Sequence, residues 1–213
     1  MSTATLSPTI SGSKYNSVFG LSLILGLATT VLSAMFLTPI LTTLNFAVSM
    51  GVCIAVLLVS SILVHVVKRP TINAVLFGAA AVAMGGLVGV VAATYSLTSI
   101  LYAVGITGGV TVLMGIMATA FPNVVRKLGS FLFLALIADL IISLVCMFIL
   151  HLPIGGWMTW AMTIVFSLYI GYDFVKAQES EPTVSNAIDN AATVYIDIVN
   201  LFLRILELTG NDD

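Results

Sequence analysis

Seven apolar runs follow one another along the chain, and each is about as long as a helix that crosses a bilayer, ~20 residues. In lipid, only helices and closed barrels satisfy all of their backbone polar groups, and runs this long and apolar favour helices. The sequence therefore predicts an all-α polytopic membrane protein with seven transmembrane helices. Their approximate bounds are residues 18–37, 46–67, 72–93, 99–121, 129–150, 154–174 and 187–208.

The composition excludes several other classes of protein. Hydrophobic residues make up 60% of the chain and charged residues only 8%, whereas a soluble domain carries about 25% charged residues. No basic run is present to hold the phosphates of a nucleic acid. The motifs H-E-x-x-H and G-x-S-x-G, the phosphate-binding Walker loop and metal-binding Cys/His spacings are missing, so no enzyme is expected. Cys53 and Cys146 stand in separate apolar runs and read as packing residues.

The chain divides into a polar N-terminal tail (1–16), one transmembrane domain (17–210) and a short C-terminal tail (211–213). The tail is rich in Ser and Thr, and the first run is too long for the apolar part of a signal peptide, so we expect it to remain as a helix. Prolines fall between the predicted helices, where a missing N–H costs least. They are Pro39, Pro70, Pro122, Pro153 and Pro182.

The basic residues predict an orientation. If seven helices alternate, six of the seven Lys and Arg residues lie on one side of the membrane. They are Lys14, Lys68, Arg69, Arg126, Lys127 and Lys176. Cytoplasmic loops carry the excess of positive charge, which places the N-terminus in the cytoplasm and Asp212-Asp213 outside. Six spans followed by a re-entrant last helix, with a cytoplasmic C-terminus, is the alternative.

Two G-x-x-x-G spacings, Gly85/Gly89 and Gly105/Gly109, occur in the third and fourth runs. Small residues at this spacing let helix backbones approach closely in lipid. We expect them to pack helices within one subunit of a monomer, with a dimer interface or a hinge as the alternatives.

The last run differs from the others because it carries a polar stripe. At about 100° per residue, its polar side chains share one arc of roughly 100°. They include Asp189, Asn190, Asp197, Asn200, Arg204 and Glu207. Charges at the centre of a lipid-facing helix cost about 2.5–3.5 kcal/mol each, so the stripe should face protein or a wet cavity. We therefore expect six helices wrapped around a central C-terminal helix.

Three aspartates fall within the predicted helices: Asp139, Asp173 and Asp197. The last two flank a short link, so they can approach each other near the cytoplasmic side. Two poorly solvated carboxylates should share a proton or hold a cation between them, with Ca²⁺ the hard, oxygen-seeking candidate. The structural alternative is a pair neutralised by a buried base. An intramembrane aspartyl protease fits poorly, because glycines of the G-x-G-D type are missing around Asp197.

Other polar residues are expected to play secondary roles. Arg204 stands three residues before Glu207 and should neutralise it. His65 lies beside Lys68 and Arg69 and is expected at the membrane interface, with a proton-sensitive site as the alternative.

The C-terminal part of the chain resembles a known family. SLYIGYD at residues 167–173 and TVYIDIVNLFLRILELTG at 193–210 closely resemble the C-terminal signature of the Bax inhibitor-1 family, also called transmembrane Bax inhibitor motif proteins. FPNVVRKLGSFLF at 121–133 resembles the link that follows the family's fourth helix. The resemblance points to the bacterial branch and thus to the bacterial inner membrane.

This resemblance implies six helices around a central one and a pH-sensitive Ca²⁺ leak sensed by paired aspartates, here Asp173 and Asp197. It also implies a basic partner at the end of the second helix, for which His65, Lys68 and Arg69 are the candidates. The second run lacks the acidic residue of the better-studied bacterial form. Some bacterial relatives instead modulate a membrane-bound ATP-dependent protease, which is the alternative function.

The two aspartates suggest a proton-controlled latch. If a base bridges them, their ionised forms hold the helices together and mild acid loosens the latch. If no base reaches them, the shared proton holds them and alkali loosens it. The basic cluster and the resemblance favour the first case, in which mild acid loosens the latch.

Overall fold

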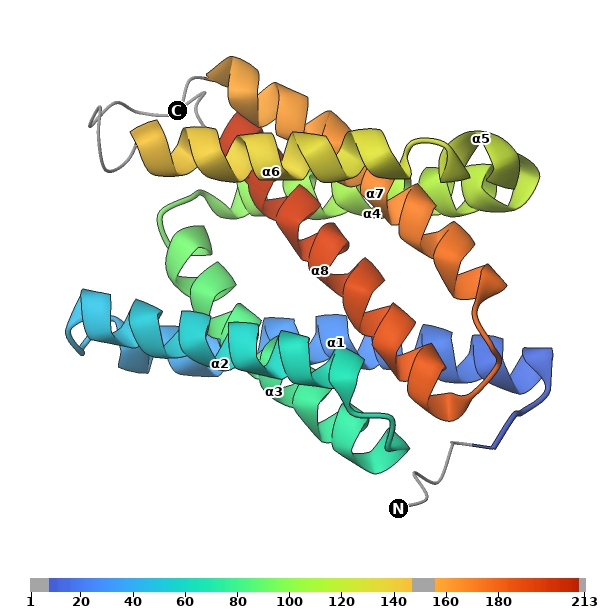
Figure 1. Ribbon diagram of the computed structural model, residues 1–213. Coiled ribbons are helices and arrows are strands. Elements are labelled where there is room, and N and C mark those ends of the chain that lie inside the picture. Colours follow the sequence, from blue (N-terminus) through green and yellow to red (C-terminus); the bar gives the residue numbers. More distant parts are fainter. Residues whose placement is uncertain (1–7, 147–155, 211–213) are drawn as a thin grey trace. The chain divides into compact units, whose positions relative to one another are not determined.

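The computed structural model describes residues 8–146 and 156–210, and within these ranges it contains eight helices and no strand (Figure 1). The fold is that of an all-α membrane protein. The helices are α1 (Gly12–Leu41), α2 (Phe46–Val66), α3 (Pro70–Ala92), α4 (Leu97–Ala120), α5 (Pro122–Arg126), α6 (Gly129–Val145), α7 (Gly156–Glu179) and α8 (Val184–Thr209).

Each predicted run corresponds to one long helix, and the short α5 lies in the link after α4. Within the described residues, five helices are long and apolar enough to cross a membrane: α1, α3, α4, α7 and residues 47–66 of α2. The described part of α6 is shorter, and the predicted remainder of that span, with Pro153 in the link beyond it, lies outside the described residues. The last helix, α8, is continuous from Val184 to Thr209, but the charges of its polar stripe make it less apolar than these five.

The first helix is longer than the sequence predicted. It begins at Gly12, because Ser11 caps it by accepting a hydrogen bond from the backbone N–H of Lys14, and Tyr15 is already buried. Residues 12–16 of the predicted tail are thus helical. The prediction that Pro39 lies between two helices was wrong, because Pro39 lies within α1. It stands near the helix end, at Leu41, where its missing N–H removes only one late hydrogen bond.

The chain separates into two compact units. The first contains α1–α3 and residues 179–195, and the second contains residues 95–178 and the chain from residue 196 onward. The helix α8 thus begins in the first unit and ends in the second. The units are described separately below.

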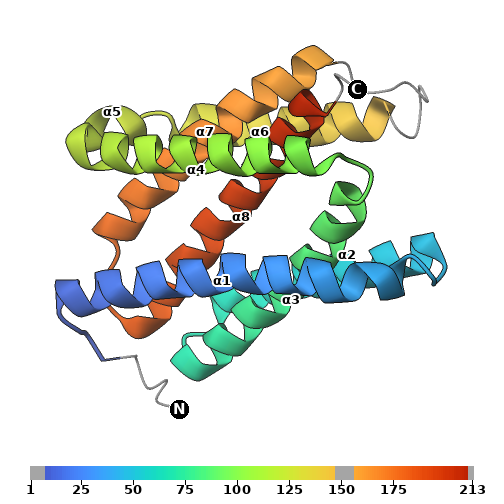
Figure 2. The ribbon, with the colours of Figure 1, turned by 180° about the vertical axis from the view of Figure 1, so that it is seen from behind.

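In the first unit, the glycines of α3 allow it to pack closely against α1, which Figure 2 shows in front of it. A Cβ atom at Gly85 would meet Ser33 and the carbonyl oxygen of Thr30, and one at Gly89 would meet Thr38 and the backbone of Ala34. This confirms the packing predicted for the first G-x-x-x-G spacing.

The second spacing behaves differently. No atom described by the structure lies within 4 Å of a Cβ built at Gly105 or Gly109. The face that α4 buries carries Ser99, Ala103 and Thr107 instead. The prediction that Gly105 and Gly109 pack helices within the subunit was therefore wrong, since open space lies beside both among the described residues.

The residues of the last helix, α8, are buried or half-buried from Val184 to Thr209. In the first unit, its first half contacts α1 through Thr30 and Tyr195, and α3 through Phe77 and Tyr195. The Thr30 and Tyr195 hydroxyls are 2.5 Å apart.

In the second unit, the other half of α8 contacts each long helix of that unit. The contacts are Ser99 of α4 with the carbonyl oxygen of Thr209, Asp139 of α6 with Arg204, and Thr159 of α7 with Glu207. Each half of α8 thus contacts the other helices of its own unit.

Candidate proton and cation site

The second unit brings together the two aspartates that the sequence singled out. Asp173 of α7 is 5% exposed and Asp197 of α8 is 8% exposed. Their side chains lie within hydrogen-bonding reach of each other. The Oδ2 atom of Asp197 is buried and has no hydrogen-bond partner among the described residues. Two carboxyl groups in such a site are held at close range only when a proton or a cation offsets their mutual repulsion.

A base that the sequence reasoning missed lies next to this pair. Lys176 Nζ is 3.6 Å from Asp173 Oδ1, and it stands one turn further along α7. The same ammonium lies 5.5 Å from the centre of the Tyr172 ring, which is within cation–π range. The i,i+3 spacing of Asp173 and Lys176 was visible in the sequence and is the signal that would have identified this partner.

Glycines position this part of α7. A Cβ at Gly171 would meet the Met114 side chain of α4, so the absence of a side chain brings the two helices close. A Cβ at Gly129, the first residue of α6, would overlap the Tyr172 ring. Tyr172 therefore packs against the start of α6, and its ring also faces the ammonium of Lys176. These contacts fix the turn of α7 that carries Asp173.

A second group of charges lies further along α8 in the same unit. Arg204 is 3.5 Å from Asp139 Oδ2 and 3.5 Å from Glu207 Oε2. Thr159 of α7 donates a hydrogen bond to Glu207 Oε1. The predicted Arg204–Glu207 pair is confirmed. The sequence did not indicate that Asp139 shares the same arginine, because nothing in it sets the register of α6 against α8.

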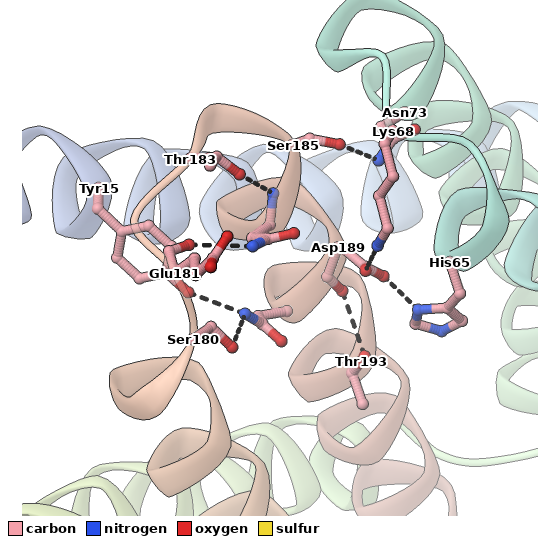
Figure 3. Close-up of polar contacts among 12 residues, drawn as sticks. Tyr15, His65, Lys68, Asn73, Ser180, Glu181, Thr183, Ser185, Asp189 and Thr193 are labelled. Atoms are coloured by element: carbon pink, nitrogen blue, oxygen red, sulfur yellow. Dashed lines mark hydrogen bonds and ion pairs between the residues drawn. The ribbon is translucent and has the colours of Figure 1, made fainter. Parts of the chain in front are cut away.

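The bases near the end of α2 have partners in the first unit. His65 Nδ1 pairs with Asp189 Oδ1, and Lys68 Nζ lies 3.1 Å from Asp189 Oδ2 (Figure 3). Arg69 is the residue that precedes α3 and caps it without a side-chain hydrogen bond. The sequence reasoning offered these three as partners of Asp173 and Asp197. The contacts that the structure gives His65 and Lys68 are with Asp189, because α2 ends beside the first turns of α8.

The remaining polar residues of the stripe also lie in protected positions. Asn190 donates hydrogen bonds to the hydroxyls of Tyr15 and Ser180. Asn200 is half-buried in the second half of α8. Most of the polar face of α8 is thus directed at protein, in keeping with the cost of placing such groups in lipid, and Glu207 is a more exposed member, at 37%.

The helices and the enclosed charges define a polytopic helical membrane protein with ionisable groups inside the bundle. Comparison with known proteins narrows this class. The sequence model of the family described as "Inhibitor of apoptosis-promoting Bax1" matches residues 15–213. The chain therefore belongs to the Bax inhibitor-1 family.

Two curated proteins from two strains of Helicobacter pylori are also similar to this chain. They are 36% and 35% identical over 131 residues, and both carry the description "Uncharacterized protein". Each match covers 58% of this chain and 53% of the relative. The chain thus spans about half the length of the curated relatives that it matches.

Proposed function

We propose that this protein is a pH-sensitive Ca²⁺ leak channel in which Asp173 and Asp197 form a proton-controlled latch between α7 and α8. The observation that carries the proposal is the approach of two buried carboxyl groups from different helices, with a lysine beside one of them. Membership of the family supports the membrane location, and the chemistry of the pair supports the rest.

In the closed state, one proton is shared between the two carboxyl groups and the remaining negative charge faces Lys176. A hydrogen bond between a neutral and an ionised carboxyl group is charge-assisted and about twice as strong as a neutral one. The ion pair with Lys176 lies within α7, so it orients the Asp173 carboxylate rather than joining the two helices, and it is weak because the lysine side chain is 55% exposed.

Mild acid opens this latch. A second proton neutralises the pair, which removes both the charge-assisted hydrogen bond and the attraction to Lys176. Lys176 lies on the same helix as Asp173, so it does not bridge α7 and α8 as the base sought at the end of α2 would, and opening in acid rests on the loss of the hydrogen bond between the two carboxyl groups. A shift from mostly closed to mostly open requires only a few kcal/mol.

The same oxygens suit Ca²⁺, which prefers carboxylate and carbonyl ligands. Among the described residues, no group of three or more Asp, Glu, His or Cys side chains is arranged to hold a metal ion. Two carboxylates and water would therefore bind Ca²⁺ briefly, as passage through a pore requires. The protein needs no cofactor and performs no enzymatic reaction in this proposal.

The purified protein in liposomes that contain a Ca²⁺-sensitive dye tests this function. We expect Ca²⁺ entry without any other protein, and we expect entry to rise as the pH is lowered from about 8 to about 6. The alternative is that the protein modulates a membrane-bound ATP-dependent protease. In that case well-folded protein would give no dye response at any pH, and the protease would copurify with it from native membranes.

We also propose that the protein is a monomer in a bacterial inner membrane, with its N-terminus in the cytoplasm. The positions of six of the seven basic residues support this orientation. A reporter enzyme fused after residue 213 should then be active only outside the cytoplasm. Activity of the fusion in the cytoplasm would favour six spans and a re-entrant α8.

A further inference from the structure

The first unit contains a separate cluster of charges where α2 ends beside α8. Asp189 accepts contacts from both His65 and Lys68 (Figure 3). Its side chain is only 14% exposed, whereas those of His65 and Lys68 are 47% and 50% exposed. An enclosed carboxylate thus faces two bases that are about half exposed at the surface of the described chain.

Among the described residues, the neighbours that hold Asp189 in place besides these two bases are neutral. From α1, the titratable neighbour is Tyr15, whose hydroxyl is bonded to Asn190. From α3, the neutral Asn73 bonds to Ser185 of α8 at 2.9 Å. The charged groups that the structure shows in contact with Asp189 are therefore His65 and Lys68, both from the end of α2.

We propose that His65 and Asp189 form a second proton-dependent contact, which holds α2 to the first half of α8 more tightly in mild acid than in alkali. We call this contact, with Lys68, the α2–α8 clamp. Histidine is the side chain whose ordinary change of charge falls between about pH 5 and 8. When His65 is protonated, the Asp189 carboxylate faces two positive charges, and when His65 is neutral, Lys68 alone supplies one.

The clamp responds to pH with the opposite sign to the latch. Mild acid weakens the contact between Asp173 and Asp197, whereas it strengthens the contact between His65 and Asp189. The first half of α8 is therefore fastened to α2 under the conditions in which the aspartate pair is released. The inference concerns the first unit alone and stands whether or not the protein conducts Ca²⁺.

A double-mutant cycle on thermal unfolding of the full chain in detergent micelles tests the clamp. The variants are His65→Gln, Asp189→Asn and the two combined, each measured at about pH 6 and about pH 8. Effects of pH on other groups cancel in the cycle. We expect coupling between His65 and Asp189 of about 2–4 °C in Tm at the lower pH and less than half as much at the higher pH. Coupling that is the same at both pH values, or missing at the lower one, would overturn the proposal.

A variant with a permanent charge provides the matched comparison. His65→Lys should keep the low-pH coupling at both pH values. It also covers the case in which Asp189→Asn does not fold. The difference in Tm between His65→Lys and His65→Gln should then be similar at both pH values, whereas the difference between wild type and His65→Gln should shrink as the pH rises. If the wild type follows His65→Gln at the lower pH, His65 does not act through its charge.

Discussion

Replacing either aspartate of the pair is expected to abolish most of the pH dependence of Ca²⁺ flux. In the wild type, the binding of one proton controls the latch, so flux should change by up to ~10-fold per pH unit. In Asp173→Asn the charged partner of Lys176 is gone. In Asp197→Asn the amide donates permanently to Asp173 and no proton is shared. Each variant should change flux by less than ~2-fold over the same interval, as measured in liposomes.

Two further variants test this result: one in which both aspartates are replaced, and one in which a carboxyl group outside the pair is replaced. Asp173→Asn/Asp197→Asn should add little to either single change, because the two groups act as a unit. Glu207→Gln serves as the control, since it removes a carboxyl group of α8 that is 37% exposed and lies outside the pair. It should retain the wild-type pH profile. A wild-type profile in both single aspartate variants would mean that the pair is structural.

The second large effect is a loss of thermal stability, which we expect when Arg204 is replaced. Replacing it with Met leaves the Asp139 carboxylate without its cation, at a position where its side chain is 12% exposed and Oδ1 has no described hydrogen-bond partner. Removing one partner of a buried ion pair costs about 3–5 kcal/mol. The lower end of this range corresponds to a fall in Tm of ~6–12 °C for a chain of this size. Thermal unfolding in detergent measures it.

A compensating substitution separates the ion pair from lost packing. Arg204→Met/Asp139→Asn should recover much of the loss, because no uncompensated charge remains. Glu207→Gln alone should cost far less, since water reaches that carboxylate. If Arg204→Met unfolds within about 1 °C of the wild type, the Asp139 pair contributes nothing to stability. Because Asp139 pairs with Arg204, Asp139→Asn would not be a neutral control in the experiments on Ca²⁺ flux.

The number of long helices, the polar stripe of α8 and the pairing of Asp173 with Asp197 could be predicted from the sequence. Each follows from local rules: the length of an apolar run, the period of a helix, and the short link that brings two carboxylates to the same side. The family resemblance independently chose the same two aspartates.

Contacts between distant helices could not be predicted in the same way. Which helix meets Arg204, or which carboxylate meets His65, depends on register and rotation, and a single sequence does not encode these in a readable form. The α4 glycines illustrate this limit, since the spacing Gly105/Gly109 is the same as that of Gly85/Gly89 but only the latter is packed within the described chain. Lys176 differs, because its i,i+3 relation to Asp173 is local and could have been found.

The central claim concerns protons on two carboxyl groups, and infrared spectroscopy of the protein in liposomes observes such protons directly. We predict that the wild type shows a protonated carboxyl signal at neutral pH that is missing from Asp173→Asn/Asp197→Asn. We also predict that this signal grows as the pH is lowered through the range in which Ca²⁺ flux rises. A wild-type spectrum identical to that of the double variant throughout this range would contradict the latch.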